Sequence, residues 1–411
     1  MLIQFSTENF KSFKDRAVLS METADHKLLK TVALYGANAA GKSNLFNAMT
    51  AAILTIRQSN IRQIGDRLTY IVPFRFSQEC EYKPSLFEFV FMAAGSKYVY
   101  RFTADNKKIH TEYLYKYNSN KPMTIFEREG EKYNFAVPAL KTELSPLVER
   151  NTANKLFLAT AAAWNSKALE IPYRWFLQID TFSSLRYDAL LPKVTKLLEN
   201  DSDGTLKKFI VALLQEADIN ISDYSIEVKE TDISDLLKTV PESFLPPVLT
   251  ASSQDKQRSY KIAMAHGIKE NDNGEQKKYY MPIAAESKGT QSLFILGPLL
   301  QEAFIKGNIL CIDEFDTNLH PMLVAYILGL FSNDKYNRNN AQLVISTHAT
   351  ELMNIAGFSD EQIYFVEKNN TTGQSELYSA DEFDFNQITD LHNAYMAGRF
   401  GAVPYIDMGN I

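Results

Sequence analysis

The chain of 411 residues is long for one compact core, so we expect two domains or one large domain with an insertion. Its 45% hydrophobic, 12% aromatic and 22% charged residues are typical of a folded soluble protein. A net charge of -6 argues against a protein coated with nucleic-acid-binding surface, although it is compatible with a local basic groove.

The two cysteines, Cys80 and Cys311, are too few for a disulfide framework, which fits a reducing cytoplasm. The N-terminus lacks the pattern of a signal peptide, and the longest nearly uncharged stretch, around residues 292–301, is too short to span a bilayer. We therefore expect a cytoplasmic protein with no membrane partner.

The N-terminal part, residues 1–135, is expected to contain strands around one helix. Alternating apolar and polar residues with turn signals between them predict an antiparallel meander after that helix. The predicted strands are residues 2–7, 17–21, 32–35, 73–76, 86–93, 98–104 and 113–117, and the predicted helix is residues 44–57.

Residues 136–258 are expected to form a mostly helical insertion with a connector. Helical periodicity runs from about residue 140 to residue 216. Prolines and serines among charged residues then suggest a long surface loop at residues 232–258.

The C-terminal part, residues 259–411, returns to alternating strands and helices, which predicts a parallel sheet. The predicted strands are residues 260–265, 278–282, 308–312, 342–346 and 362–367, and the predicted helices are residues 291–305, 321–331 and 350–355.

Residues 36–43 form a complete G-x-x-x-x-G-K-[ST] motif between a predicted buried strand and a predicted helix. Such a loop directs backbone N–H groups and the positive end of a helix dipole into one concavity, where phosphate binds. The glycines permit close approach, Lys42 reaches the β and γ phosphates, and the Ser43 hydroxyl ligates Mg²⁺. The candidate nucleotide-binding residues of this segment are Gly36, Asn38, Ala39, Ala40, Gly41, Lys42, Ser43 and Asn44.

An acidic pair, Asp313 and Glu314, follows the apolar run at residues 309–312. The run predicts a buried parallel strand, with Asp313 at its carboxyl end to hold Mg²⁺ and Glu314 beside it to polarise the attacking water. The pair lies much further from Gly36 than a minimal nucleotide-binding core requires. A large domain is therefore expected between the two halves of the site.

Three more segments accompany these motifs: a Ser-x-Gly sequence at residues 286–291 that opens an apolar helix, residues 315–321, and residues 346–348. Together the motifs resemble the ATP-binding-cassette (ABC) class, in its soluble branch of chromosome-maintenance, break-repair and OLD-type phage-defence ATPases. The resemblance implies an α/β P-loop NTPase fold of the ABC ATPase type, with an antiparallel β meander, a mostly helical insertion, and Mg²⁺-dependent ATP hydrolysis.

The resemblance implies roles for single residues at the reaction centre. Glu314, His348 and Lys42 would be catalytic, with His348 as the switch histidine that contacts the γ-phosphate. Ser43 and Asp313 would ligate Mg²⁺.

Further residues would contact the nucleotide. Asn9 and Lys11, in an Asn-Phe-x-Ser-Phe element, would lie beside the base and ribose, and Asp316 would belong to the D-loop. Ser287 and Gly289 would be signature residues that meet ATP held by a partner subunit, which implies a homodimer or higher homo-oligomer. The signature departs from the usual Leu-Ser-Gly-Gly-Gln pattern at Lys288 and Thr290. For the Q-loop, residues 74–78 with Gln78 are the best region.

More narrowly, the chain resembles stand-alone AAA-like, ABC-type ATPases of bacterial defence operons, in which a Toprim or RloB-like nuclease is a separate effector. That resemblance implies a sensor or regulatory subunit of an anti-phage system. The alternative is a DNA-transaction ATPase that clamps DNA. A transporter subunit is disfavoured, because the insertion is large and the amino-terminal element is of the soluble type.

Overall fold

The computed structural model describes residues 1–117, 121–217, 220–232, 256–269, 276–383, 388 and 390–404. The chain divides into two compact units: Met1–Arg186 with Glu302–Ile411, and Tyr187–Gln301. Each is described by itself below.

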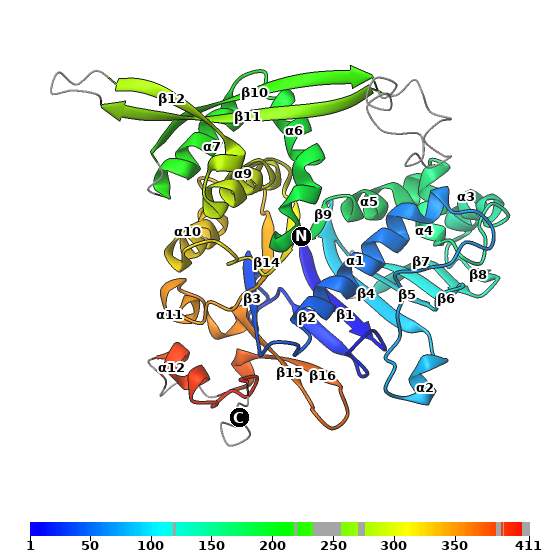
Figure 1. Cartoon of the computed structure of the whole chain (residues 1–411). Coiled ribbons are helices and arrows are strands. Elements are labelled where there is room, and N and C mark those ends of the chain that lie inside the picture. The colour runs from blue at the N-terminus through cyan, green and yellow to red at the C-terminus, as the bar shows by residue number, and fades with distance from the viewer. Residues whose placement is uncertain are drawn as a thin grey trace, which may run out of the picture. The chain divides into compact units, whose positions relative to one another are not determined.

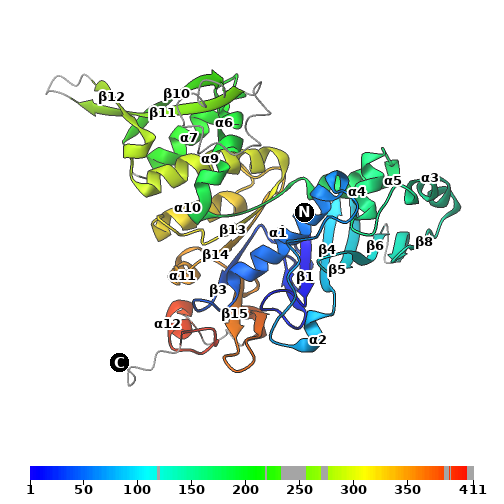
Figure 2. The same cartoon turned by 45° about the vertical axis from the view of Figure 1, so that its right-hand side comes forward.

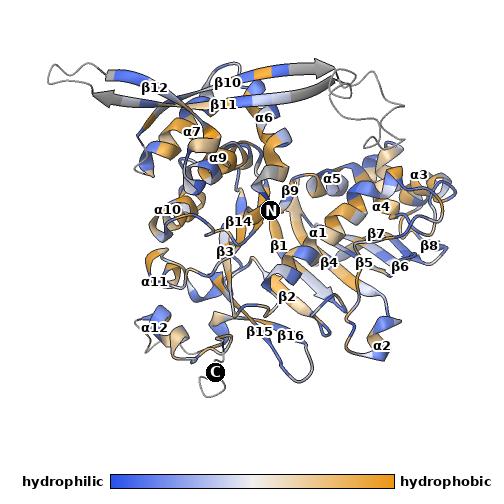
Figure 3. Ribbon diagram, in the orientation of Figure 1, coloured by the Kyte–Doolittle hydropathy of each residue, from blue (hydrophilic) through white to orange (hydrophobic). Residues whose placement is uncertain are grey.

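The first unit contains a six-stranded sheet that is parallel except for one edge strand (Figure 1). Strands β3 and β14 are buried along their whole length, which explains their nearly continuous apolar sequence (Figure 3). The parallel sheet predicted from the strand–helix alternation is confirmed. In spatial order the strands are β16 (Ser375–Ser379), β15 (Ile363–Lys368), β3 (Thr31–Tyr35), β14 (Gln342–Ser346), β13 (Ile309–Asp313) and β9 (Ile179–Ser183).

A seven-stranded antiparallel sheet forms the other layer of this unit and confirms the predicted meander. The predicted strand at residues 73–76 is wrong, because these residues form a loop, and β7 and β8 extend the sheet beyond the prediction. The order is β2 (Ala17–Ser20), β1 (Leu2–Glu8), β4 (Ser85–Ala93), β5 (Ser96–Ala104), β6 (Ile109–Tyr117), β7 (Pro122–Glu129) and β8 (Lys132–Asn134).

Helix α1 (Lys42–Gln58) packs against both sheets of the first unit (Figure 1 and Figure 2). Its apolar residues recur at helical spacing, and Leu45, Met49 and Ile53 are buried. A second tie comes from the buried Gln342, whose Oε1 accepts from Leu2 N at 2.6 Å. The two sheets are therefore held together by α1 and by this hydrogen bond between β1 and β14.

Helices α3 (Pro138–Val148), α4 (Phe157–Ala163) and α5 (Lys167–Phe176) share the hydrophobic core of the antiparallel sheet. Trp175 stacks on Phe91 with ring centroids 3.9 Å apart. These helices therefore belong to the first unit, whereas we expected the insertion to begin at residue 136. The remaining helices of this unit are α2 (Gln78–Glu81), α10 (Pro321–Ser332), α11 (Leu352–Ile355) and α12 (Leu391–Met396).

The second unit combines helices with a three-stranded antiparallel sheet, so it is less helical than expected. Tyr224 packs edge-to-face on Phe294 at 5.1 Å between the sheet and a helix. Most of the predicted connector at residues 232–258 lies outside the described residues. The elements are α6 (Leu191–Glu199), α7 (Thr205–Glu216), β10 (Ile221–Asp232), β11 (Lys256–Lys269), β12 (Gln276–Pro282) and the first part of α9 (Lys288–Lys306). In the described ranges no helix combines the length and apolarity needed to cross a membrane.

Candidate nucleotide-binding site

The glycine-rich loop joins the carboxyl end of β3 to the first residue of α1. Gly36 and Gly41 have φ values of 151° and 123°. A Cβ at Gly36 would lie 2.3 Å from Val366 O, and one at Gly41 would lie 2.5 Å from Ser375 Oγ. Only glycine fits at either position, so the packing of neighbouring strands fixes a cradle of backbone N–H groups at the start of a helix.

The ammonium group of Lys42 lies inside this loop. Its Nζ donates hydrogen bonds to Gly36 O at 2.6 Å and to Ala37 O at 3.2 Å. Burial lowers the pKa of Lys42, while the carboxylates of Asp313, Glu314 and Asp316 oppose the shift. The ammonium group of Lys42 therefore interacts electrostatically with all three acids that are predicted to share its site.

Strand register explains how residues so distant in sequence meet. Leu34 of β3 pairs with Ser346 of β14, and Ile345 pairs with Ile312 of β13. The carboxyl ends of the three strands therefore coincide, which places Asp313 two strands, or roughly 10 Å, from the end of β3. Both motifs lie at the edge of the sheet where α/β folds bind ligands.

The backbone of Glu314 is held in a left-handed conformation, with φ 55°, that is uncommon for a residue with a side chain. Its N–H donates to Ser346 Oγ at 2.7 Å, and its carbonyl accepts a hydrogen bond from Ser184 Oγ. Ser346 Oγ in turn donates to Asp313 Oδ1 at 2.5 Å. Two serines therefore orient the acidic pair.

Asp316 and His348 also meet at this edge. The backbone N–H of His348 donates to Asp316 Oδ2 at 3.1 Å, and the His348 side chain is exposed. Asp316 Oδ1 is buried with no hydrogen-bond partner among the described residues. An unsatisfied buried carboxylate oxygen is costly, so this atom is a candidate contact for a ligand or a partner.

The Asn-Phe-x-Ser-Phe element adjoins the loop, and the side chain of Asn9 is held inside the protein. Its side chain is 4% exposed: Nδ2 donates to Cys80 O at 2.8 Å and to Lys83 O at 2.9 Å, and Oδ1 accepts from Phe74 N at 3.1 Å. Every hydrogen-bonding atom of this amide is used inside the protein. The Asn9 side chain thus positions the loop at residues 73–76, while the contact of this element with the base and ribose stays a prediction.

Asn44 directly follows the phosphate loop, and Lys11 directly precedes Ser12, which lies against Gly41 of the loop. Lys11 has a φ of 50°, and burial lowers the pKa of its ammonium group. Asn44 Nδ2 donates to Ser12 Oγ at 2.8 Å, which ties the element to the first turn of α1.

Ser287 and Gly289 lie in the second unit, at the start of α9. Ser287 Oγ accepts from Thr290 N at 3.1 Å, as a helix-capping residue does. The sequence correctly predicted that this segment opens a helix, although the helix begins earlier than expected.

The donor set fits Mg²⁺. Ser43 presents an exposed hydroxyl in the first turn of α1, and Asp313 supplies a carboxylate oxygen. Among the described residues no group of three or more His, Cys, Asp or Glu side chains could hold a metal by itself. Mg²⁺ typically combines one or two protein ligands with phosphate and water oxygens, which suits this sparse pair.

One side of the site was not found from the sequence. Strand β9 runs parallel to β13, and its last residue, Ser183, is paired with Asp313. Ser183 and Ser184 therefore stand at the same edge as the acids, whereas Gln78, chosen for the Q-loop, begins helix α2. The only signal was a short strand-like run, residues 179–183, within a region of helical periodicity.

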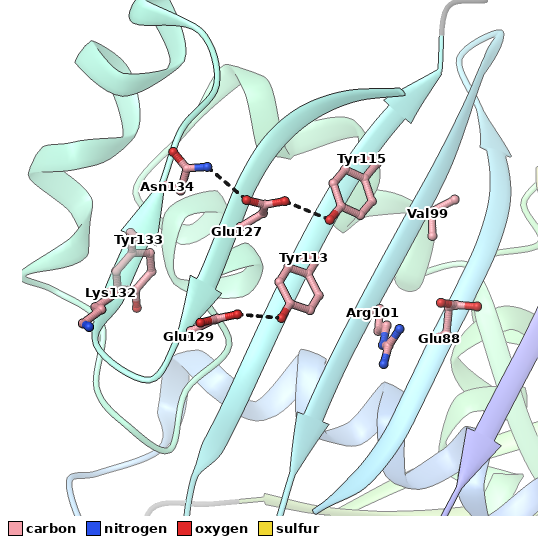
Figure 4. Close-up of a pocket in the computed structure, with 10 residues that line it drawn as sticks. All are labelled: Glu88, Val99, Arg101, Tyr113, Tyr115, Glu127, Glu129, Lys132, Tyr133 and Asn134. Atoms are coloured by element: carbon pink, nitrogen blue, oxygen red, sulfur yellow. Dashed lines mark hydrogen bonds between the residues drawn. The ribbon is translucent and has the colours of Figure 1, made fainter. Parts of the chain in front are cut away.

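A hollow of about 670 Å³ on the outer face of the antiparallel sheet is separate from this site (Figure 4). Tyr115 donates to Glu127 at 2.9 Å and Tyr113 to Glu129 at 3.4 Å. In each pair the tyrosine hydroxyl donates its hydrogen bond to the glutamate carboxylate. None of the predicted site residues lines the hollow.

The sequence model of a protein family described as "AAA domain, putative AbiEii toxin, Type IV TA system" matches residues 32–354. That range includes the phosphate loop, the acidic pair and His348. No curated protein matches the chain.

Solved structures of SMC head domains are similar at low identity. The head domain from Thermotoga maritima is 14% identical, with 92% of this chain and 98% of that chain covered and a TM-score of 0.43. A head domain with an extended coiled coil bound to the C-terminal domain of ScpA, from Pyrococcus furiosus, is 13% identical, with 92% and 96% covered and a TM-score of 0.42.

Proposed function

The chain belongs to the AAA-domain family whose model matches residues 32–354, and we propose on this premise that it binds and hydrolyses ATP with Mg²⁺. The observation that carries the proposal is that β3, β14 and β13 end at the same edge of the sheet, which brings Asp313 and Glu314 to the side where the loop after β3 holds the buried Lys42. A phosphate cradle alone would explain binding, whereas the acidic pair beside it supplies what hydrolysis needs.

Each side chain has a distinct task in this proposal. The loop N–H groups and Lys42 bind the phosphates, and Lys42 exchanges its carbonyl partners for phosphate oxygens. Glu314 orients or deprotonates the attacking water, while His348 donates a hydrogen bond to the transferring phosphoryl group. Ser43 and Asp313 would hold Mg²⁺, which neutralises charge on the phosphates when bound.

Two variants test the reaction. Lys42→Ala should abolish ATP binding measured by calorimetry, because the phosphates lose their cation. Glu314→Gln should keep binding and slow turnover by around two orders of magnitude or more, because the water loses its base. Normal ATP affinity in the first variant would refute the loop assignment, and undiminished turnover in the second would remove Glu314 from its role.

We further propose that two subunits close around ATP. Support comes from the serine-capped start of α9, where Ser287 and Gly289 could receive phosphate oxygens from a partner's ATP, and from the unpartnered Asp316 Oδ1. Light scattering of Glu314→Gln with and without ATP tests this, because a closed dimer should accumulate when hydrolysis is blocked. A mass that does not change with ATP would contradict it.

For the biological role we propose a sensor or regulatory subunit of a cytoplasmic anti-phage system that controls a separate nuclease-type effector. The proposal rests on the resemblance of the motifs to ATPases of bacterial defence operons, and the family description names a toxin of a toxin–antitoxin system. Co-purification with the product of a neighbouring gene would favour it. ATPase stimulation by DNA together with salt-sensitive DNA binding would instead favour the DNA-clamping alternative.

A further inference from the structure

A hollow of about 620 Å³ opens beside the phosphate loop, and we call it the β15 hollow. It is lined by residues 37–40 of the loop, by residues 366–370 at the end of β15, and by residues 402–404. Strand β15 lies on the side of β3 opposite β14 and β13. The hollow therefore adjoins the loop on the side away from the acidic pair.

An exposed aromatic ring stands at this hollow. Phe76 is 73% exposed and lines both the β15 hollow and a neighbouring hollow of about 500 Å³. A Cβ on Gly373 would lie 2.7 Å from the ring, and Phe74 packs edge-to-face against it at 5.7 Å. The ring is thus supported from behind and open in front, which suits stacking on a planar ligand.

Polar groups line the hollow near this ring. Asn369 Oδ1 accepts from Thr371 N at 2.9 Å and from Thr372 N at 3.0 Å, which fixes the turn between β15 and β16. Asn370 is exposed, and within the described ranges its side chain makes no hydrogen bond and Lys368 makes no ion pair. The side-chain amide of Asn370 and the ammonium group of Lys368 can therefore donate hydrogen bonds to the edge of a heterocycle.

The segment at residues 398–404 is a firmly packed wall. Tyr378 OH donates to Phe400 O at 2.7 Å, and Tyr395 OH donates to Ala402 O at 2.9 Å. Tyr395 also contacts Tyr35, the residue before Gly36, with ring centroids 6.3 Å apart. The wall is therefore built on the strand that carries the phosphate loop.

We propose that the β15 hollow binds the purine base of the nucleotide, with Phe76 stacked on the base. This inference rests on the proposed function, because it takes the phosphates to be in the loop. If the γ-phosphate faces the acids at β13, the nucleoside leaves the loop toward the opposite side, where the hollow lies. Its volume is within the range of small-molecule sites, and a purine offers more stacking surface than a pyrimidine.

The test compares ATP with inorganic tripolyphosphate, which has the phosphates but no base, by calorimetry on the full chain. Phe76→Ala should weaken ATP binding about five- to 100-fold and leave tripolyphosphate affinity unchanged, whereas Phe76→Trp should restore ATP affinity. Gly373→Ala, whose Cβ would displace the Phe76 ring, should weaken the binding of ATP but not that of tripolyphosphate. Tyr82→Ala is the matched control, since Tyr82 is 86% exposed and lines neither hollow.

The possible outcomes distinguish failure of the phosphate-loop function from failure of the proposed base site. If tripolyphosphate does not bind the unmodified protein, the phosphate-loop function itself fails. If tripolyphosphate binds but Phe76→Ala leaves ATP affinity unchanged, or weakens both ligands equally, the base site is overturned. A wild-type preference for ATP over CTP that Phe76→Ala removes would support the purine assignment.

Discussion

Ser346 is hydrogen bonded to both members of the acidic pair: its hydroxyl donates to Asp313 Oδ1 at 2.5 Å and accepts from Glu314 N at 2.7 Å. The serine is buried at the end of β14, between the strand that carries the phosphate loop and the strand that carries the acids. It therefore couples the orientation of the Asp313 carboxylate, the proposed metal ligand, to that of the Glu314 backbone.

We expect Ser346→Ala to raise the Mg²⁺ concentration needed for half-maximal turnover and to lower turnover about tenfold, because outer-shell partners of metal ligands typically contribute 10- to 100-fold. ATP binding without Mg²⁺ should be nearly unchanged. Steady-state ATPase rates across a Mg²⁺ titration measure both effects. Rates identical to wild type at every Mg²⁺ concentration would contradict this role of Ser346.

Gly36→Ala should weaken ATP binding at least tenfold, because the new Cβ would collide with Val366 O at 2.3 Å and the φ of 151° is strained for alanine. The matched control is Gly329→Ala in α10, where a Cβ would meet no other heavy atom within 4 Å. That change should keep ATP affinity and stabilise the helix by up to about 1 kcal/mol. Calorimetry and thermal melting distinguish the two, and equal ATP affinity in both variants would disprove the steric argument.

Glu112→Gln should lower the free energy of unfolding by about 3 kcal/mol. Glu112 is fully buried, pairs with Arg128 at 3.5 Å, and accepts from Phe157 N at 2.7 Å and Leu158 N at 2.9 Å. Burial raises the pKa of Glu112, while Arg128 and the N–H donors oppose that shift. The amide would leave Arg128 without its countercharge.

Exposed Glu129, on the same sheet, provides the comparison for this variant, and Glu129→Gln should change stability by no more than about 0.5 kcal/mol. Urea unfolding monitored by tryptophan fluorescence measures both. Similar denaturation midpoints for the two variants would show that the buried pair contributes little.

A feature could be predicted from the sequence where all the residues that produce it lie in one short segment. An apolar strand, the glycines of residues 36–43 and a helix start follow one another directly, and these three features predict a phosphate-binding loop from one segment of the sequence. The apolar run before Asp313 likewise predicted a buried strand with an acid at its end.

Sequence was insufficient where a role depends on distant partners. Asn9 matched a family motif, yet its amide is used by backbone groups of Phe74, Cys80 and Lys83, which no local pattern reveals. Strand β9 has only five residues within a helical region, and it is stabilised by pairing with β13 rather than by its own propensity. The helices at residues 138–176 looked like an insertion because their shared core with the antiparallel sheet is a property of packing.

The sequence by itself determined the α/β class, the phosphate loop and the identity of the acidic residues, because these depend on short-range periodicity and on the chemistry of adjacent residues. Only the tertiary structure decided that β14 lies between β3 and β13, that Ser346 orients both acids, and that residues 402–404 line a hollow beside the loop. The physical reason is that strand order and side-chain contacts between distant segments arise from burial of a common core, which no single stretch of the chain encodes.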